Sequence, residues 1–469
     1  RSTLFPYTTL FRSPYSGMGH ALTGLINVPV GDTFAIRATG FYRSDDGFID
    51  SIGNNPIPTL QNPAVNIVNG SRVEDELNGL ETYGGRLSAL YRPSESFSLH
   101  LMALFQDIRS DNADRYEVDP DTNEPLYGDL VASRYHPEFT DIDYRVYSAT
   151  IDWDFGPTTL QSVTSYATFE ETFQRDAALT PLGGAPVSQL ATFLFSTPGT
   201  TDRLLSGILN QITSTDKFTQ EFRLVSPESD AFEWLLGAYY TDEDSGIDPQ
   251  TVTAVDPGTE NPAAGIPALL EARLPSTYEE LSLFANATWH VTDRFDLAFG
   301  GRWSENDQQA SQVLTGALLG GATITFDDVN SSENPFTYSV SPRFELTDTT
   351  SMYARVATGF RPGGPNVLPP GAPPGTPASY DSDELTSYEV GLKSSTADGS
   401  FSFDLAAYYL DWEDVQLLAV VNSVGLNTNG GTAVSKGLEF TASARVTEGL
   451  SFSLDRKSTR LNSSHPYRS

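Results

Sequence analysis

The chain has 469 residues, with 28 basic and 61 acidic side chains, a net charge of −33 at pH 7 and no cysteine. Such an acidic surface repels nucleic acid, and the lack of cysteine excludes disulfides, thiolate metal sites and a cysteine nucleophile. No run of apolar residues approaches the roughly 18 that a transmembrane helix requires, so no such helix is predicted.

Two terminal segments differ in composition from the rest of the chain. Residues 1–13 (RSTLFPYTTLFRS) and 456–469 (RKSTRLNSSHPYRS) contain no acidic residue, although the chain holds 61. We interpret both as non-native scars of sequencing or assembly and leave them out of the fold prediction. The alternative is that they are native basic tails. The predicted structural unit is therefore residues 14–455.

Between His20 and Asp455 the sequence alternates apolar and polar residues over segments of about ten residues or more. Examples in chain order are TFAIRATGFYR (33–43), SFSLHLMALFQ (96–106), RFDLAFGGRWS (294–304) and FTYSVSPRFEL (336–346). A period of two predicts β-strands with one apolar and one polar face. We predict about sixteen such strands in an all-β, antiparallel fold.

Short turns alternate with long polar segments along the chain. Turns such as PVGD (29–32), DFGPT (154–158) and VTDR (291–294) are mostly followed, one strand later, by a long segment. The longest of these predicted loops are 44–80, 108–140, 171–215 and 242–276. Short turns at one end of the strands and long loops at the other are typical of antiparallel transmembrane β-barrels.

The cost of charge in lipid predicts which face of each strand points inward. A lone arginine facing lipid at mid-depth costs about 2–4 kcal/mol. We therefore expect the charged strand residues to face the lumen; they are Arg37, Arg86, Arg302, Arg343, Arg355, Glu389, Lys393 and Glu439. We expect Phe34, Leu99, Leu297, Val356 and Leu405 to face lipid.

The stretch YARVATGFRPGGPN (353–366) joins a strand to a segment that cannot continue it, because its prolines and glycines break a ladder. The strand-to-loop motif consists of Gly359, Phe360, Arg361, Pro362, Gly363, Gly364 and Asn366. One interpretation is structural, in which the motif ends a strand and begins a loop. The other makes Arg361 a contact at the mouth of the lumen, where it is the best single candidate.

The segment DPDTNE (119–124) begins like a calcium-binding loop, with Asp119, Asp121 and Asn123 at alternating positions. Glu124 stands where such a loop needs glycine, and Leu130 stands where it needs glutamate. A solvated acidic loop is the favoured interpretation, and neither a bound metal nor another cofactor is predicted. Because no P-loop, HExxH, GxSxG or Cys/His array occurs, we do not predict an enzyme.

An ordered set of stretches resembles the TonB-dependent outer-membrane receptors. They are LINVPVGDTFAIRATGFYRSDDGFID (25–50), TQEFRLVSP followed by FEWLLGAYY (219–240), YARVATGFRPGGPN (353–366), ELTSYEVGLKS (384–394), FSFDLAAYYLDWEDVQL (401–417) and SKGLEF (435–440). The resemblance implies a barrel of roughly 22 strands, closed by an N-terminal plug domain, in the outer membrane of a Gram-negative bacterium. It also implies import of a scarce nutrient, with ferric siderophore as the first expectation, using energy from TonB.

The chain departs from the family pattern at both ends, since no plug precedes Pro14 and further strands would follow Asp455. We expect a partial barrel of about sixteen strands in contact with outer-membrane lipid, without the plug that carries the TonB contact. The strand around 21–30 is then expected not to pair with the strand around 450–455. Two alternatives stay open, namely a carbohydrate- or oligosaccharide-uptake receptor of the same family and a self-closing passive porin of about sixteen strands.

Overall fold

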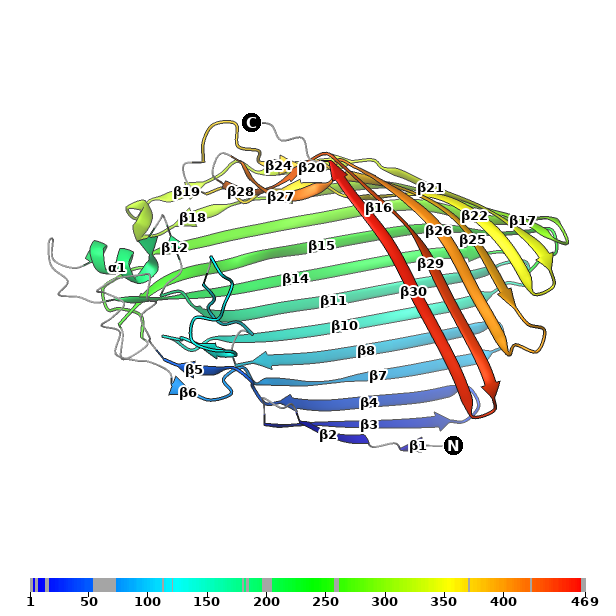
Figure 1. The fold of residues 1–469 in the computed structure, drawn as a ribbon, viewed down its shortest axis with the longest axis horizontal. Helices are drawn as coiled ribbons and strands as arrows, with labels where there is room; N and C mark the ends of the chain where they lie inside the picture. The colour runs from blue at the N-terminus through cyan, green and yellow to red at the C-terminus, as the bar shows by residue number, and fades with distance from the viewer. Residues whose placement is uncertain are drawn as a thin grey trace.

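A computed structural model describes residues 3–4, 7–12, 17–53, 73–111, 114–119, 121–178, 181–182, 185–195, 205–256, 261–369, 372–421 and 424–464. Almost all of these residues lie in strands or in the connections between strands (Figure 1). The one α-helix in this part of the chain, α1 (Val187–Phe195), has 9 residues. No helix among the described residues has the length and apolar composition needed to span a membrane.

Sixteen long strands of the described chain follow one another in a single antiparallel ladder. In chain order they are β3 (Met18–Val30), β4 (Phe34–Asp45), β7 (Leu80–Ser94), β8 (Phe97–Ser110), β10 (Phe139–Asp154), β11 (Thr159–Asp176), β14 (Ser206–Val225), β15 (Phe232–Val255), β16 (Leu270–Thr292), β17 (Phe295–Ala310), β21 (Phe336–Thr347), β22 (Thr350–Arg361), β25 (Asp383–Ser395), β26 (Phe401–Glu413), β29 (Thr432–Thr447) and β30 (Leu450–Ser464). This confirms the all-β, antiparallel prediction and its approximate strand number.

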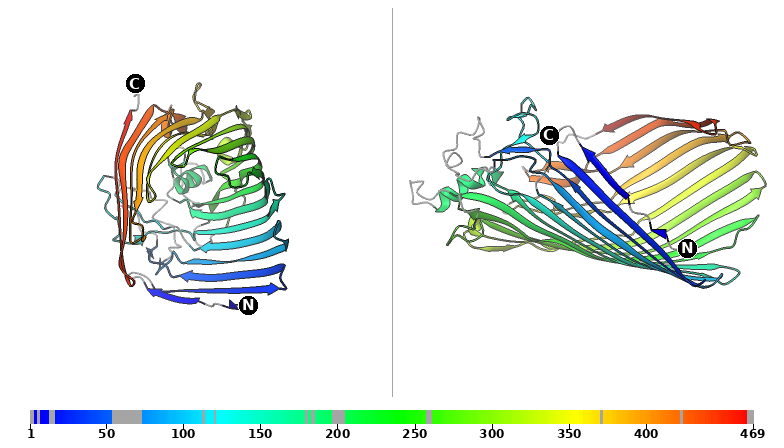
Figure 2. Two further views of the ribbon diagram at one scale, coloured as in Figure 1. Left: turned by 90° about the vertical axis from the view of Figure 1, so that its right-hand side faces the viewer. Right: turned by 90° about the horizontal axis from the view of Figure 1, so that it is seen from below.

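The ladder curves into a shell whose two edges are β30 on one side and β3, with β1 and β2, on the other (Figure 2). The short strands β1 (Thr3–Leu4) and β2 (Tyr7–Arg12) pair with β3, and β30 continues to Ser464. The ladder thus extends into both terminal segments, because backbone pairing does not depend on side-chain identity. As expected, no pairing among the described residues joins β30 to β3.

Cross-strand register confirms the predicted assignment of faces. Residues directly opposite in an antiparallel ladder share a face, and successive residues alternate. On this basis one face carries Arg37, Arg86, Arg302, Arg343, Arg355, Glu389, Lys393 and Glu439, and the other carries Phe34, Leu99, Leu297, Val356 and Leu405. The charged face is the concave one, since the loop segments that lie inside the shell bond to it, as Gln308 does to Gly363.

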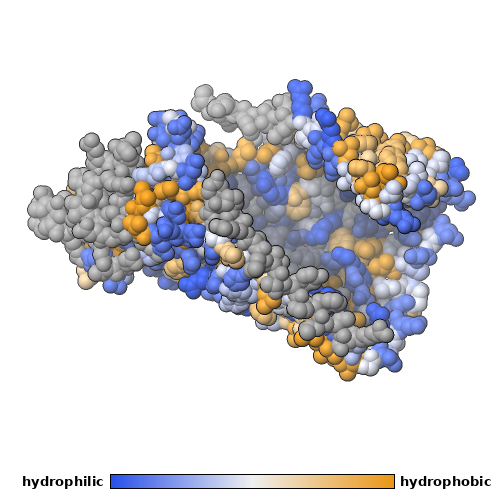
Figure 3. All heavy atoms as spheres, turned by 60° about the horizontal axis from the view of Figure 1, so that its bottom comes forward, coloured by the Kyte–Doolittle hydropathy of each residue, from blue (hydrophilic) through white to orange (hydrophobic). Residues whose placement is uncertain are grey.

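Exposure follows the same alternation. Large apolar side chains of the convex face are among the most exposed in the described chain, including Leu87, Leu236, Leu283, Val390 and Leu438. Polar residues of the concave face, such as Ser282 and Ser304, are buried. Figure 3 shows the hollow that this concave face lines. The distribution is the reverse of that in a water-soluble domain and suits a wall between lipid and a polar lumen.

The two ends of the sheet differ as the turn pattern predicted, but two of the predicted loops are shorter than expected. The predicted loop 242–276 is largely strand, because β15 continues to Val255 and β16 begins at Leu270. The predicted loop 171–215 is also shortened at both ends, since β11 reaches Asp176 and β14 begins at Ser206. These extensions mix polar residues with apolar ones such as Ile247 and Leu274, and the backbone ladder satisfies their N–H and C=O groups.

Short elements occupy the loop end of the sheet. They are β5 (Asp50–Ile52), β6 (Val73–Glu74), β9 (Val131–Ala132), β12 (Pro181–Leu182), β13 (Ala185–Pro186), β18 (Val313–Thr315), η2 (Ala317–Leu319), β19 (Thr323–Thr325), β20 (Val329–Glu333), β23 (Gly364–Pro365), β24 (Ser379–Tyr380), β27 (Gln416–Val421) and β28 (Val424–Asn429). Two of the pairs they form, β23–β24 and the hairpin β27–β28, build the site described next.

Candidate ligand site at the loop end of the sheet

The strand-to-loop motif turns the chain across the inner face of the sheet. Strand β22 ends at Arg361, and the chain then forms β23, which pairs with β24. Gly363 lies so close to this return segment that an added Cβ would be 2.3 Å from the Tyr380 carbonyl oxygen. Glycine is therefore required here for close backbone approach, which explains the glycine-rich break that follows the strand.

Arg361 is held at this turn by an ion pair and an aromatic ring. Its guanidinium donates to Oδ2 of Asp383 at 2.5 Å and lies 5.5 Å from the centroid of the Trp412 ring. The Asp383 side chain is only 3% exposed, whereas that of Arg361 is 51% exposed. Asp383 also accepts the backbone N–H of Gln416. The pair thus joins the ends of β22 and β25 to the hairpin β27–β28.

Side-chain amides clamp the backbone of the neighbouring segments. Gln416 Nε2 donates to the Pro362 carbonyl at 2.8 Å, and Asn429 Nδ2 donates to the Asp381 carbonyl at 2.8 Å. Asn366 exchanges two hydrogen bonds with the backbone of Asn427, at 2.9 and 3.0 Å. These neutral bonds fix the segment after β22 against the hairpin without adding charge to the site.

A further amide fixes the same segment to the wall of the shell. Gln308 of β17 donates from Nε2 to the Gly363 carbonyl at 2.9 Å. The space enclosed in this way is a polar chamber of about 540 Å³, and its lining includes Glu243, Tyr278, Gln308, Arg361, Tyr380 and Gln416. A chamber of this size accommodates a small-molecule ligand. Arg361 supplies a partly exposed cation at its wall.

The other sequence-predicted candidates lie elsewhere on the concave face. Arg302 donates to Glu280 Oε1 at 2.6 Å and lies 5.3 Å from the centroid of the Tyr239 ring, on β15 to β17. Arg355 lies opposite Glu389 in the ladder between β22 and β25. The structure therefore separates the charged candidates, and of these only Arg361, followed by Pro362 and Gly363 of the same motif, is among the described residues lining the chamber.

The remaining charged candidates form pairs along β25, β26 and β29. Tyr353 donates to Glu389 Oε1 at 2.7 Å, and Lys393 lies 3.6 Å from Asp404. Glu439 contacts Lys457 at 2.5 Å, within the terminal segment that the fold prediction left out. The two ion pairs compensate charge on the concave wall and the Tyr353 hydroxyl satisfies the Glu389 carboxylate, so a structural role explains these residues.

The acidic segment 119–124 forms a tight turn. Oδ1 of Asp119 accepts the backbone N–H groups of Asp121 and Thr122 at 2.8 and 3.0 Å. Asn123 adopts a left-handed backbone conformation, with φ of 58°. An Asx turn therefore accounts for the Asp119 carboxylate, and the described residues contain no group of three His, Cys, Asp or Glu placed to hold a metal ion.

Sequence reasoning missed most of the amide clamps. Asn366 belongs to the predicted motif, but Gln308, Gln312, Gln416 and Asn429 were not singled out. The available signal was compositional, since the segments ENDQQASQ (305–312) and NTNGG (427–431), at the ends of β17 and β28, are rich in amides. Their backbone partners are distant in sequence, so the pairing itself was not predictable from a local pattern.

Comparison with known proteins gives the family of the chain. The family model described as TonB dependent receptor-like, beta-barrel matches residues 86–466. The pesticin receptors of Yersinia enterocolitica and Yersinia pestis are each 31% identical to the chain, over 182 and 180 residues. These matches cover 38% of this chain and 26% of each receptor, so the chain aligns with about a quarter of their length.

Solved structures of low sequence identity share the fold. The ferric yersiniabactin uptake receptor FyuA of Yersinia pestis aligns over 99% of this chain and 61% of its own, with a TM-score of 0.73 and 18% identity. The siderophore receptor PiuA of Acinetobacter baumannii aligns over 99% and 64%, with a TM-score of 0.68 and 13% identity. The copper transporter OprC aligns over 98% and 62%, with a TM-score of 0.65 and 12% identity.

The fold and the lipid-facing outer surface define a transmembrane β-barrel wall of the outer-membrane type. The chain belongs to the TonB-dependent receptor β-barrel family. That family consists of receptors and transporters of the Gram-negative outer membrane and not of enzymes.

Proposed function

We propose that the chain forms part of the barrel of a receptor that takes up ferric siderophore across the outer membrane. The energy for transport comes from TonB, through a plug domain that contacts the lumen wall. The observation that carries the proposal is the loop-end chamber, which lies on the concave face of a sheet of this family and has Arg361 at its wall. A ligand arriving from the loop side meets this chamber before it reaches the lumen.

Two further observations support the siderophore over the carbohydrate alternative. FyuA and PiuA, which share the fold, are described as a ferric yersiniabactin uptake receptor and a siderophore receptor. Among its described residues the chamber also contains one cationic side chain, Arg361, and two phenols, Tyr278 and Tyr380.

The proposal is tested in cells that carry the natural gene. Deletion of the gene is expected to abolish uptake of at least one radiolabelled ferric siderophore under iron limitation, and loss of TonB is expected to do the same. Arg361→Ala in the chromosomal gene is expected to reduce that uptake, whereas Arg361→Lys keeps part of it. Undiminished iron uptake in the deletion strain, together with lost uptake of an oligosaccharide, would favour the carbohydrate receptor instead.

A further inference from the structure

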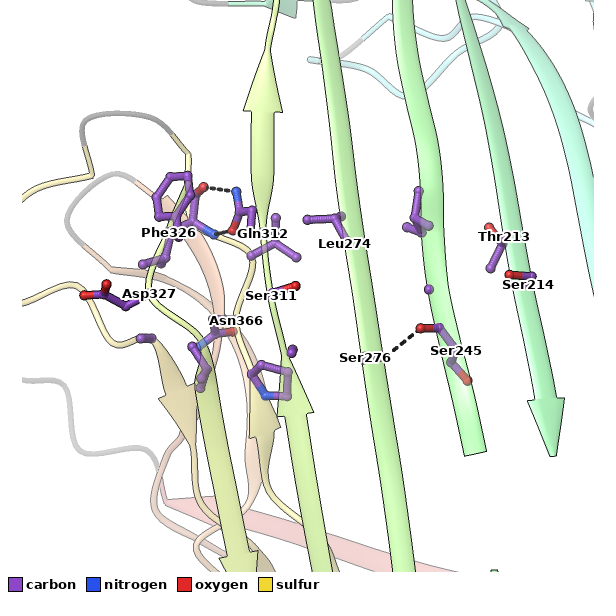
Figure 4. Close-up of a pocket in the computed structure, with 18 of the residues that line it drawn as sticks. Thr213, Ser214, Ser245, Leu274, Ser276, Ser311, Gln312, Phe326, Asp327 and Asn366 are labelled. Atoms are coloured by element: carbon purple, nitrogen blue, oxygen red, sulfur yellow. Dashed lines mark hydrogen bonds between the residues drawn. The ribbon is translucent and has the colours of Figure 1, made fainter. Parts of the chain in front are cut away.

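A second cavity adjoins the polar chamber at the loop end of β14 to β17 (Figure 4). Its volume is about 510 Å³. The strands form its floor, and the segment from Pro365 to Leu368, together with Ala378, forms part of its wall. Two residues, Ser276 and Pro365, line both this cavity and the polar chamber, so the two spaces are neighbours.

The wall segment is fixed by a two-way clamp. Gln312 donates from Nε2 to the Leu368 carbonyl at 2.5 Å and accepts the Leu368 backbone N–H at 3.0 Å. Both ends of the amide are therefore engaged by the protein backbone. The clamp holds the segment away from the strands. Without it, the apolar segment would pack against the strands and fill the cavity.

The accessible surface inside the cavity is mainly apolar. Leu274 and Ile247 lie opposite each other on β16 and β15, and Phe326, Val329, Val367 and Leu368 come from the connecting segments. The hydroxyls of Ser276 and Ser245 have partners within the protein, since Ser276 donates to the Ser245 carbonyl and Ser245 bonds to Thr215 and Glu243. An occupant is thus not required to supply hydrogen bonds to them.

Charge limits the kind of group that the cavity accepts. Of the described residues that line it, Asp327 is the one with an ionisable side chain, and in Figure 4 its carboxylate points away from Leu274 and Ser276. An anionic group would lose its hydration here and find no lysine or arginine in return. An uncharged apolar group gains about 25 cal/mol for each Å² removed from water.

We propose that this cavity, the apolar pocket, binds an uncharged and largely apolar arm of the transported ligand, such as an aryl or short acyl group. The iron-bearing polar part then occupies the adjoining chamber beside Arg361. This inference rests on the proposed function, and it narrows the ligand to a chelate that carries such an arm. Chelates whose periphery is anionic throughout are excluded from the apolar pocket.

A pair of matched probes tests the chemistry of the pocket without iron uptake. The probes are 2-naphthamide and 2-naphthoate, which share a ring and shape and differ by one charge. Binding to the receptor, purified from outer membranes of cells that carry its gene, is titrated by saturation-transfer NMR against receptor-free membranes as blank. We expect saturable binding of the amide and at least tenfold weaker binding of the carboxylate, a difference of about 1.4 kcal/mol.

Two substitutions locate the binding. Leu274→Trp fills the pocket from β16, and Ile247→Trp fills it from β15, so each is expected to weaken amide binding at least tenfold. Leu281→Trp is the matched control, because Leu281 lies on the convex face of the same strand and is 44% exposed. Its amide binding should equal that of the wild type. Heat-modifiable gel migration of each variant shows whether the barrel has folded.

Three results would overturn the inference. They are equal or tighter binding of the carboxylate, unchanged amide binding in a folded filling variant, and binding of neither probe to the wild type. Each of these results is measured by probe binding alone, so none of them bears on the uptake experiment that tests the proposed function. Conversely, specific amide binding with no uptake phenotype on gene deletion would refute the proposed function while retaining the pocket.

Discussion

The half-exposed guanidinium of Arg361 compensates the charge of the buried Asp383 carboxylate. Removing the guanidinium in Arg361→Ala leaves the Asp383 carboxylate, 3% exposed, with only the Gln416 N–H as a described partner. An unsatisfied buried acceptor costs about 1–3 kcal/mol. We expect faster amide hydrogen exchange in residues 416–429 and a matching loss of stability. In Arg361→Ala combined with Asp383→Asn, part of that loss should be recovered, and equal exchange in both would contradict the argument.

Val356 and Ala357 are neighbours on β22 that test the assignment of faces. Val356 lies on the convex face, and Ala357 lies on the concave face opposite Ser339 and Ser387. Val356→Arg is expected to destabilise the barrel by about 2–4 kcal/mol, because the charge enters lipid near mid-depth. Ala357→Arg should cost far less in a wet lumen. Urea unfolding in lipid vesicles measures both, and similar losses would show that the register is wrong.

At the scale of elements, Asp176 attaches the loop between β8 and β10 to the end of β11. Its carboxylate accepts the backbone N–H groups of Tyr135, His136 and Ala178 at 2.6, 3.2 and 3.0 Å. The backbone N–H of Asp176 donates in turn to Glu138 at 3.0 Å. Asp176 is thereby one of the side chains that hold this loop at the loop end of the sheet, together with Gln174, whose Nε2 donates to the Pro137 carbonyl at 2.8 Å.

This attachment predicts a dependence on pH. Burial, and to a smaller extent the nearby Glu138 carboxylate, raise the pKa of the Asp176 carboxyl to about 6, although the three backbone donors lower it. A raised carboxyl pKa means that the folded loop binds the proton more tightly than the open loop does. Its stability is therefore greatest at about pH 4, falls as pH rises to about 6 and is constant above that.

Asp176→Asn removes the titration while keeping an acceptor oxygen. We expect the variant to lose the pH dependence of hydrogen exchange in residues 131–138 between about pH 4 and 6, after correction for intrinsic exchange. Asp121→Asn, the same chemical change at an exposed position of that loop, is the control and should keep the wild-type profile. An unchanged slope in Asp176→Asn would rule out Asp176 as the titrating group.

The elements also show what the sequence could predict. Strands such as β22 and β26 were predictable because lipid demands an apolar residue at every second position. The upper part of β15 was not, since the consecutive polar residues 241–245 interrupt the alternation there. The Arg361 turn was predictable as a break from Pro362 and Gly363. Its clamps were not, because Asn427 and Gln416 contact it only after distant strands have paired.

For the whole molecule, the decisive feature is the open ladder. Strand β30 pairs with β29, and within the described residues its other edge has no partner strand. Strand β3 is partly covered by β1 and β2. In lipid each unpaired backbone group costs several kcal/mol, so an uncovered edge of 15 residues is a severe penalty. A barrel of this family avoids it by complete closure.

We therefore expect the 469-residue chain, expressed alone and directed to an outer membrane, to aggregate or to fold poorly. It should show no heat-modifiable band on gels, whereas a resident closed barrel in the same membrane, serving as control, keeps its band. Because no closed barrel forms, it should also show no TonB-dependent uptake of labelled siderophore. Appearance of a heat-modifiable, protease-resistant species with energy-dependent uptake would mean that the two edges close.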